Sequence, residues 1–136
     1  QRIVISNRVM HIGMGAFSEC YSLTNIEVAK DNQYYQSIDG NLYSKDGKTL
    51  LKYAPGKKAT SFTIPNTVTY IDGGAFDNDC LESIIIPSSV TVIDGYAFYD
   101  CASLTIYCEA ESQPATWDED WNANNLPVVW GATLSE

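Results

Sequence analysis

Apolar and polar positions follow one pattern that is written into this chain three times. A valine, an isoleucine three positions later and an Ala-Phe pair recur with a Val-to-Phe spacing of eight. The copies are Val9-x-x-Ile12-x-x-Gly15-Ala16-Phe17, Val68-x-x-Ile71-x-x-Gly74-Ala75-Phe76 and Val90-x-x-Ile93-x-x-Tyr96-Ala97-Phe98. The second and third copies start 22 residues apart. A fixed period near this length predicts a solenoid of stacked coils.

A short strand is predicted six positions before each valine. The three strands are Ile3-Val4-Ile5, Phe62-Thr63-Ile64 and Ile84-Ile85-Ile86. Because side chains alternate across a strand, Ile84 and Ile86 are expected to point inward and Ile85 outward. A tight turn or a single helical turn is expected at Ala97-Phe98. No coil can bury its apolar face alone, so stacking must build the core.

Residues 29–61 break the period. Asp39-Gly40 and Asp46-Gly47 both lie between strand-forming residues. Asp-Gly in this setting is a strong indication of a β-hairpin. We therefore interpret the segment as one modified coil that carries a β-hairpin insert.

Residues 109–136 lose the repeat and contain all three tryptophans. The spacing of Trp117 and Trp121 would place both on one face of a short helix that starts after Pro114. Solenoid ends expose apolar core and need a terminal cap. We expect this segment to be a Trp-rich C-terminal cap.

Composition narrows the functional classes. The 136 residues carry a net charge of −9, which disfavours nucleic acid and anionic membrane surfaces as partners. No apolar run approaches the length of a membrane span, so no membrane insertion is expected. No signal peptide is visible, and because residue 1 opens on a repeat strand we expect an upstream coil or export signal in the full protein.

The four cysteines do not resemble a disulfide framework. Cys20 and Cys101 each lie three residues after the repeat phenylalanine, where a buried cysteine acts as a small hydrophobe. Cys80 comes one place late, since its copy is a residue shorter before Leu81. Cys80 and Cys101 could reach bridging distance, and Cys108 lies on the last strand. With one histidine and no Cys-x-x-Cys pair, no metal site or other cofactor is expected.

The repeat resembles the BspA-like leucine-rich repeat, also called LRR type 5. The residues that carry the resemblance follow the pattern I-P-x-x-V-x-x-I-x-x-x-A-F-x-x-C-x-x-L: Ile86, Pro87, Val90, Ile93, Ala97, Phe98, Cys101 and Leu104. The resemblance implies a leucine-rich-repeat solenoid of the α/β horseshoe class. It would be β-rich, with short helical or 3-10 turns, one β-hairpin insert and a Trp-rich C-terminal cap. It also implies a bacterial protein that is secreted or exposed on the cell surface and that functions in adhesion, and it supplies no catalytic residues.

We expect one domain over 1–136, with first coils in 1–28, the hairpin-bearing insert in 29–61, further coils in 62–108 and the cap in 109–136. Outward strand positions are the candidate ligand-binding residues, because stacking should bring them into one ladder on a continuous surface. They are Val4, Glu27, Thr63, Ile85 and Tyr107. The alternative is that these residues are ordinary strand formers on a sheet face.

Three other kinds of site are compatible with the composition. Asp72 and Asp94 precede Gly73 and Gly95 in adjacent coils, near Asp77-Asn78-Asp79 and Asp100, and could bind Ca²⁺, although capping of the following turns is favoured. The 9 tyrosines and 3 tryptophans could stack on sugars, although packing of the hairpin insert explains Tyr34, Tyr35, Tyr43 and Tyr53. His11 is the single histidine, and Glu109 and Glu111 resemble a solvated edge, so no enzyme activity is expected.

The sequence therefore favours a non-catalytic binding module at the cell surface or outside the cell. Its partner would be a protein ligand, of which a host extracellular protein is one example. The alternatives are a glycan-binding accessory module and a structural spacer within a larger surface protein.

Overall fold

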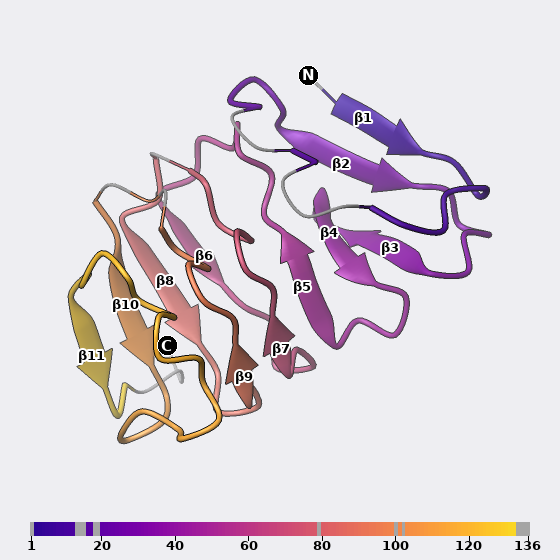
Figure 1. Ribbon diagram of the computed structural model, residues 1–136. Helices are drawn as coiled ribbons and strands as arrows, with labels where there is room; N and C mark the ends of the chain where they lie inside the picture. Colours follow the sequence, from indigo (N-terminus) through magenta and orange to yellow (C-terminus); the bar gives the residue numbers. More distant parts are fainter. Residues whose placement is uncertain are drawn as a thin grey trace.

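The computed structural model describes residues 2–12, 16–17, 20–78, 80–99, 101 and 103–132. These residues form strands and turns that stack as successive coils (Figure 1). The predicted solenoid is confirmed. The expected helical or 3-10 turns are wrong for the described residues, which connect their strands through turns and bends and contain no helix.

A four-stranded parallel sheet covers one side of the C-terminal coils. Its strands are β6 (Ser61–Thr63), β8 (Ser83–Ile86), β10 (Thr105–Cys108) and β11 (Val128–Trp130), in the order β11-β10-β8-β6. Phe62, Ile84, Ile106 and Val128 are register partners along it. Each of these partners comes 22 residues after the one before it, so the 22-residue period of the sequence corresponds to one coil of the solenoid.

A five-stranded sheet covers the other side of the coils, in the order β3-β4-β5-β7-β9. Its strands are β3 (Tyr35–Ile38), β4 (Asn41–Ser44), β5 (Thr49–Lys52), β7 (Tyr70–Ile71) and β9 (Val92–Ile93). Strands β3, β4 and β5 pair antiparallel, whereas β5, β7 and β9 pair parallel. Both Asp-Gly pairs lie in hairpin turns, so the insert predicted as one hairpin is three antiparallel strands, and β5 leads it back into the solenoid.

The third sheet lies at the N-terminal end and contains β1 (Arg2–Ile5) and β2 (Asn25–Val28), which pair parallel. It does not continue into the four-stranded sheet. The turn between β3 and β4 lies beside β2 instead, and the Ile26 N–H donates to the Gly40 carbonyl at 2.8 Å. Gly40 has a φ of 80°, which favours glycine, and a Cβ there would displace the Asn25 side chain, whose Oδ1 would lie 2.5 Å away.

The core is continuous through the C-terminal coils. One aromatic side chain per coil lines it, and the four follow one another at spacings of 23, 22 and 23 residues: Tyr53, Phe76, Phe98 and Trp121. Each is less than 5% exposed. Trp121 therefore takes the place of the repeat phenylalanine, and β11 pairs in register with β10. The cap continues the path of the coils where we expected the repeat to be lost.

The helix expected after Pro114 is wrong. The Asp118 N–H donates to the Ile93 carbonyl at 2.9 Å, and the Trp117 indole N–H donates to the Val90 carbonyl at 3.4 Å. The Asp118 N–H, which a helix would bond internally, is thus donated to the preceding coil. Trp117 and Trp121 still pack together, with ring centroids 4.9 Å apart.

The buried position expected for cysteine is taken by asparagine in the shortened copy. Asn78 is fully buried, whereas Cys80 is half-buried. Counted back from the next leucine, Asn78 matches Cys20 and Cys101, since each lies three residues before Leu81, Leu23 or Leu104. The four cysteines form no disulfide, so no bridge joins Cys80 to Cys101. Gly15, Asp79, Asp100 and the end of the cap, residues 133–136, lie outside the described residues.

Candidate ligand-binding surface

Three of the five candidate residues form one straight row. Thr63 is the register partner of Ile85, and Ile85 is the partner of Tyr107. The row ends at Val129, the partner of Tyr107 on β11, which the sequence analysis missed. We call these four residues the outer row: Thr63, Ile85, Tyr107 and Val129.

Alternation along the strands explains why the outer row is accessible. Ile84 and Ile106 are fully buried, while their neighbours Ile85 and Tyr107 are half-buried. Thr63 and Val129, at the two edges of the sheet, are exposed, Val129 by 43%. The outer row thus presents a methyl-bearing threonine, two aliphatic side chains and a phenol on one sheet face.

A parallel row of hydroxyl groups lies two residues earlier on each strand. Ser61, Ser83 and Thr105 are register partners on β6, β8 and β10. They point to the same face as the outer row because side chains two apart share a face. The combined surface offers apolar contact and hydrogen bonding side by side.

The other two candidates do not belong to this surface. Val4 and Glu27 are register partners, but they lie on the separate β1-β2 sheet. The expected single ladder is wrong, because the turn at Asp39-Gly40 interrupts the sheet. Glu27 is also engaged within its own sheet, where its Oε2 lies 3.4 Å from Arg2 and accepts a hydrogen bond from Asn25 at 2.9 Å.

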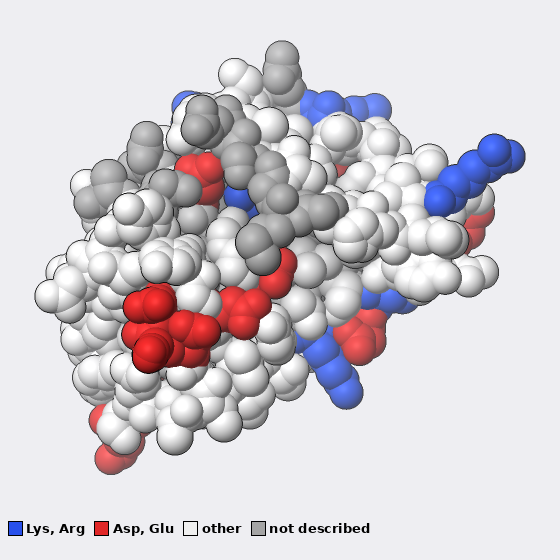
Figure 2. Space-filling model, viewed as in Figure 1, with Lys and Arg blue, Asp and Glu red and all other residues white. Residues whose placement is uncertain are grey.

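Charge is distributed unevenly along the solenoid. All 8 lysine and arginine residues lie at or before Lys58, whereas 12 of the 17 acidic residues lie after it. The four-stranded sheet therefore belongs to a half that contains no basic side chain. Figure 2 shows acidic side chains gathered in a band over the C-terminal coils, while the basic ones lie toward the N-terminal half.

Three aspartates form a ladder along these coils. The N–H groups of Asp72, Asp94 and Asp118 donate to the coil before at Leu50, Ile71 and Ile93, so the three residues occupy equivalent places. Partial burial and the nearby Asp94 charge raise the pKa of Asp72, while a hydrogen bond from the Gly73 backbone opposes the shift.

Asp94 has a local partner in addition. The Tyr70 hydroxyl donates to its two carboxylate oxygens at 2.8 Å, and this bond raises the tyrosine pKa to about 12. In the described residues, no three His, Cys, Asp or Glu side chains are grouped to hold a metal ion. The hydrogen bonds of the aspartate ladder therefore serve to join neighbouring coils.

Cys108 and His11 are far apart in the sequence and differ in exposure. Burial raises the pKa of the Cys108 thiol to about 12, so it stays protonated and unreactive at neutral pH. His11 lies on the exposed surface at the opposite end of the chain. The described part of the chain also contains no helix of the length and apolarity needed to cross a membrane.

Comparison with known proteins gives the same architecture. A leucine-rich repeat protein from Eubacterium ventriosum is 26% identical over 95% of this chain and 42% of its own, with a TM-score of 0.58. A leucine rich cell surface protein from Faecalibacterium prausnitzii is 24% identical over 98% of this chain and 48% of its own, with a TM-score of 0.65. The pneumococcal vaccine antigen PcpA is 18% identical over 96% of this chain and 43% of its own, with a TM-score of 0.59.

The chain spans less than half the length of each of these structures. No curated protein matches its sequence. The family description "BspA type Leucine rich repeat region" matches residues 1–48 and 52–113 in 6 copies. With most of its length matched and its coils stacked at a 22-residue period, the chain belongs to the BspA-type leucine-rich repeat family.

Proposed function

We propose that this chain is a non-catalytic module of a cell-surface or secreted bacterial protein and that it binds a protein ligand through the outer row. The observation that carries the proposal is the register of Thr63, Ile85, Tyr107 and Val129 on one sheet face. Solenoids use such extended surfaces for recognition. A surface location is supported by two of the similar structures, one described as a cell surface protein and the other as a vaccine antigen.

The composition of the row suits protein recognition. Tyrosine is enriched among residues that dominate binding energy, and a central aromatic flanked by aliphatic groups excludes water from the contact. The hydroxyl row beside it supplies hydrogen-bond donors and acceptors. The absence of basic side chains after Lys58 favours a partner with a positively charged contact surface, and binding should weaken as salt rises.

The test is binding of the purified chain to a panel of immobilised host matrix proteins, with Ile85→Glu and Tyr107→Ala as variants. Each should weaken binding about 10-fold or more, as expected for a central contact. Val4→Glu is the matched control, since it makes the same kind of change on the separate β1-β2 sheet. Thr63→Arg should weaken binding by repelling a positively charged partner.

Equal loss in the Val4→Glu variant would contradict the sheet-face assignment. So would unchanged binding by the Ile85→Glu and Tyr107→Ala variants once circular dichroism shows that they are folded.

A further inference from the structure

A pocket of about 410 Å³ lies at the C-terminal end of the solenoid, on the opposite side of β11 from the outer row. Alternation explains the separation, because Val128 and Trp130 point inward while Val129 points outward. We call it the end pocket. Eight residues line it: Gln113, Glu119, Trp121, Asn122, Asn125, Leu126, Val128 and Trp130. We propose that the end pocket binds a neutral pyranose ring.

Two indole rings line the end pocket. Trp121 and Trp130 both line the pocket, and their rings meet edge to face, with centroids 6.2 Å apart and an interplanar angle of 67°. Trp121 is buried to 4% exposure, whereas Trp130 is half-buried and is the more accessible of the two rings. Indole faces carry negative charge density and attract the polarised C–H groups of a sugar ring.

The two rings are held in place before any ligand arrives. Trp130 lies in β11, where it is the register partner of Cys108, and the following Gly131 N–H donates to the Ala110 carbonyl at 2.8 Å. Trp117 packs against both rings, and its ring centroid lies 4.9 Å from that of Trp121 and 5.8 Å from that of Trp130. A rigid aromatic wall lowers the entropy cost of binding.

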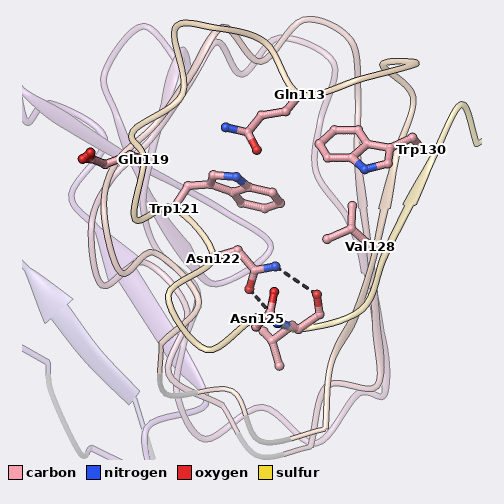
Figure 3. Close-up of a pocket in the computed structure, with 8 residues that line it drawn as sticks. Gln113, Glu119, Trp121, Asn122, Asn125, Val128 and Trp130 are labelled. Carbon is pink, nitrogen blue, oxygen red and sulfur yellow. Dashed lines mark hydrogen bonds between the residues drawn. The ribbon is translucent and has the colours of Figure 1, made fainter.

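The amide side chains of the pocket differ in their hydrogen bonding (Figure 3). Asn122 is structural: its Nδ2 donates to the Leu126 carbonyl and its Oδ1 accepts from the Leu126 N–H, both at 2.9 Å. Gln113 lies on the other side of Trp121 and has no hydrogen bond to another described residue. A free amide beside an indole can donate to and accept from sugar hydroxyls. Four of the eight lining side chains are polar, so the pocket offers hydrogen bonds beside the indole rings.

The negative charge around the pocket favours a neutral sugar over an anionic one. Glu119 lines the pocket, its carboxylate turned away from the indoles, and Asp118 and Asp120 flank it in the chain. No lysine or arginine occurs after Lys58 to offset these carboxylates. An anionic sugar such as a sialylated or sulfated one would be repelled. The volume falls within the roughly 300–1,000 Å³ that is typical of small-ligand sites.

The test is a glycan array followed by titration of the chain with the methyl glycosides of the neutral sugars that bind, read by tryptophan fluorescence. We expect signals for neutral pyranosides and none for sialylated or sulfated glycans. Gln113→Ala should weaken binding about 3- to 10-fold, the effect of one lost hydrogen bond. Because Gln113 is exposed and supports no other described residue, this variant should fold normally.

Gln33→Ala is the matched control, since Gln33 is exposed far from the end pocket, and its binding should equal that of the unchanged chain. Trp130→Phe keeps an aromatic wall of smaller area and should bind more weakly than the unchanged chain. An array with no neutral-sugar signal, a preference for acidic glycans, or equal binding by the Gln113→Ala and Gln33→Ala variants would overturn the proposal.

Discussion

Phe76 and Phe98 stack face to face in the core, with ring centroids 5.0 Å apart and an interplanar angle of 16°. Both rings are buried to 1% exposure or less, and each comes from the Ala-Phe pair of its repeat. Tyr53 continues the column on one side at 5.5 Å from Phe76, and Trp121 ends it at 6.2 Å from Phe98. This column joins successive coils, so a change in one ring should affect the whole stack.

Replacing Phe98 by alanine should lower the free energy of unfolding by about 3–5 kcal/mol, because it leaves a cavity between two aromatic neighbours. Phe98→Leu should cost less, since leucine refills most of the space. Urea denaturation followed by circular dichroism measures both. Tyr99→Ala, next in the chain but 50% exposed, is the control and should change stability by less than about 1 kcal/mol. A cost for Phe98→Ala as small as the control would contradict the column.

The side chain of Asn78 forms hydrogen bonds to the backbone of two neighbouring coils. Its Nδ2 donates to the carbonyls of Pro55 and Lys57 at 3.1 and 2.9 Å, and its Oδ1 accepts from the N–H groups of Cys80 and Leu81 at 2.7 and 3.0 Å. Asn78→Ala leaves these backbone groups without partners in a buried site. We expect a loss of about 2–4 kcal/mol, since each unsatisfied group costs about 1–3 kcal/mol.

The control for Asn78 is Asn66→Ala, because Asn66 is exposed in a turn. Its effect should stay within about 0.5 kcal/mol. If both alanine variants unfold at the same urea concentration, the bridging role of Asn78 is wrong.

Local spacing in the sequence was sufficient to predict several features of the fold. The 22-residue period specified which residues are register partners, and alternation separated buried Ile84 from accessible Ile85. The Asp-Gly pairs specified both hairpins because left-handed turn residues leave a local signature; Asp39 and Gly40 have φ of 53° and 80°. These features depend on residues close together in the chain.

Features that depend on contacts between coils could not be predicted from the sequence. Nothing near Asp39 indicates that its turn would lie beside β2 and divide the sheet. The second copy is one residue shorter between Phe76 and Leu81, and spacing alone matched Cys80, one place late, to the repeat cysteine, whereas the buried position belongs to Asn78. Val129 was missed because Val128-Val129-Trp130 follows a segment without the repeat phrase, and only pairing with β10 reveals it.

The raised pKa of Asp72 gives stability a defined dependence on pH. Burial and the Asp94 charge favour the protonated form in the folded chain, so the folded state binds its proton more tightly than the unfolded state. Stability should therefore fall as the pH rises from the ordinary aspartate range through the folded pKa, and stay reduced above it.

Asp72→Asn removes this dependence while leaving an oxygen that can accept from Gly73. At pH 7 the variant should be more stable by roughly 0.5 kcal/mol, a value kept small because the site is only half-buried. The gain should vanish below the ordinary aspartate pKa, where the unchanged chain is protonated too. Urea denaturation at several pH values decides it, and a constant difference between the two proteins across the range would contradict the assignment.

Tyr96 is held in a backbone conformation that suits glycine. Its φ is 64°, and the equivalent residue of the preceding copy, Gly74, has a φ of 74°. A bulky residue in this region is strained by about 1–2 kcal/mol. Tyr96 is 53% exposed, and its ring contacts Tyr99 at 5.5 Å, so the side chain gains little burial in return.

Comparing Tyr96→Gly with Tyr96→Ala isolates the strain, because both lose the ring and only glycine relieves the backbone. The glycine variant should be more stable than the alanine variant by about 1 kcal/mol, the reverse of the order at ordinary positions. Tyr99, whose φ is not positive, supplies the control: there the alanine variant should be the more stable. Thermal and urea denaturation of the four variants gives both differences. If the alanine variant is the more stable at both positions, the left-handed backbone at Tyr96 stores no strain. If glycine is the more stable at position 96 and alanine at position 99, the backbone at Tyr96 is strained by any side chain that carries a Cβ, and the chain retains an exposed tyrosine there at a cost in stability that glycine avoids.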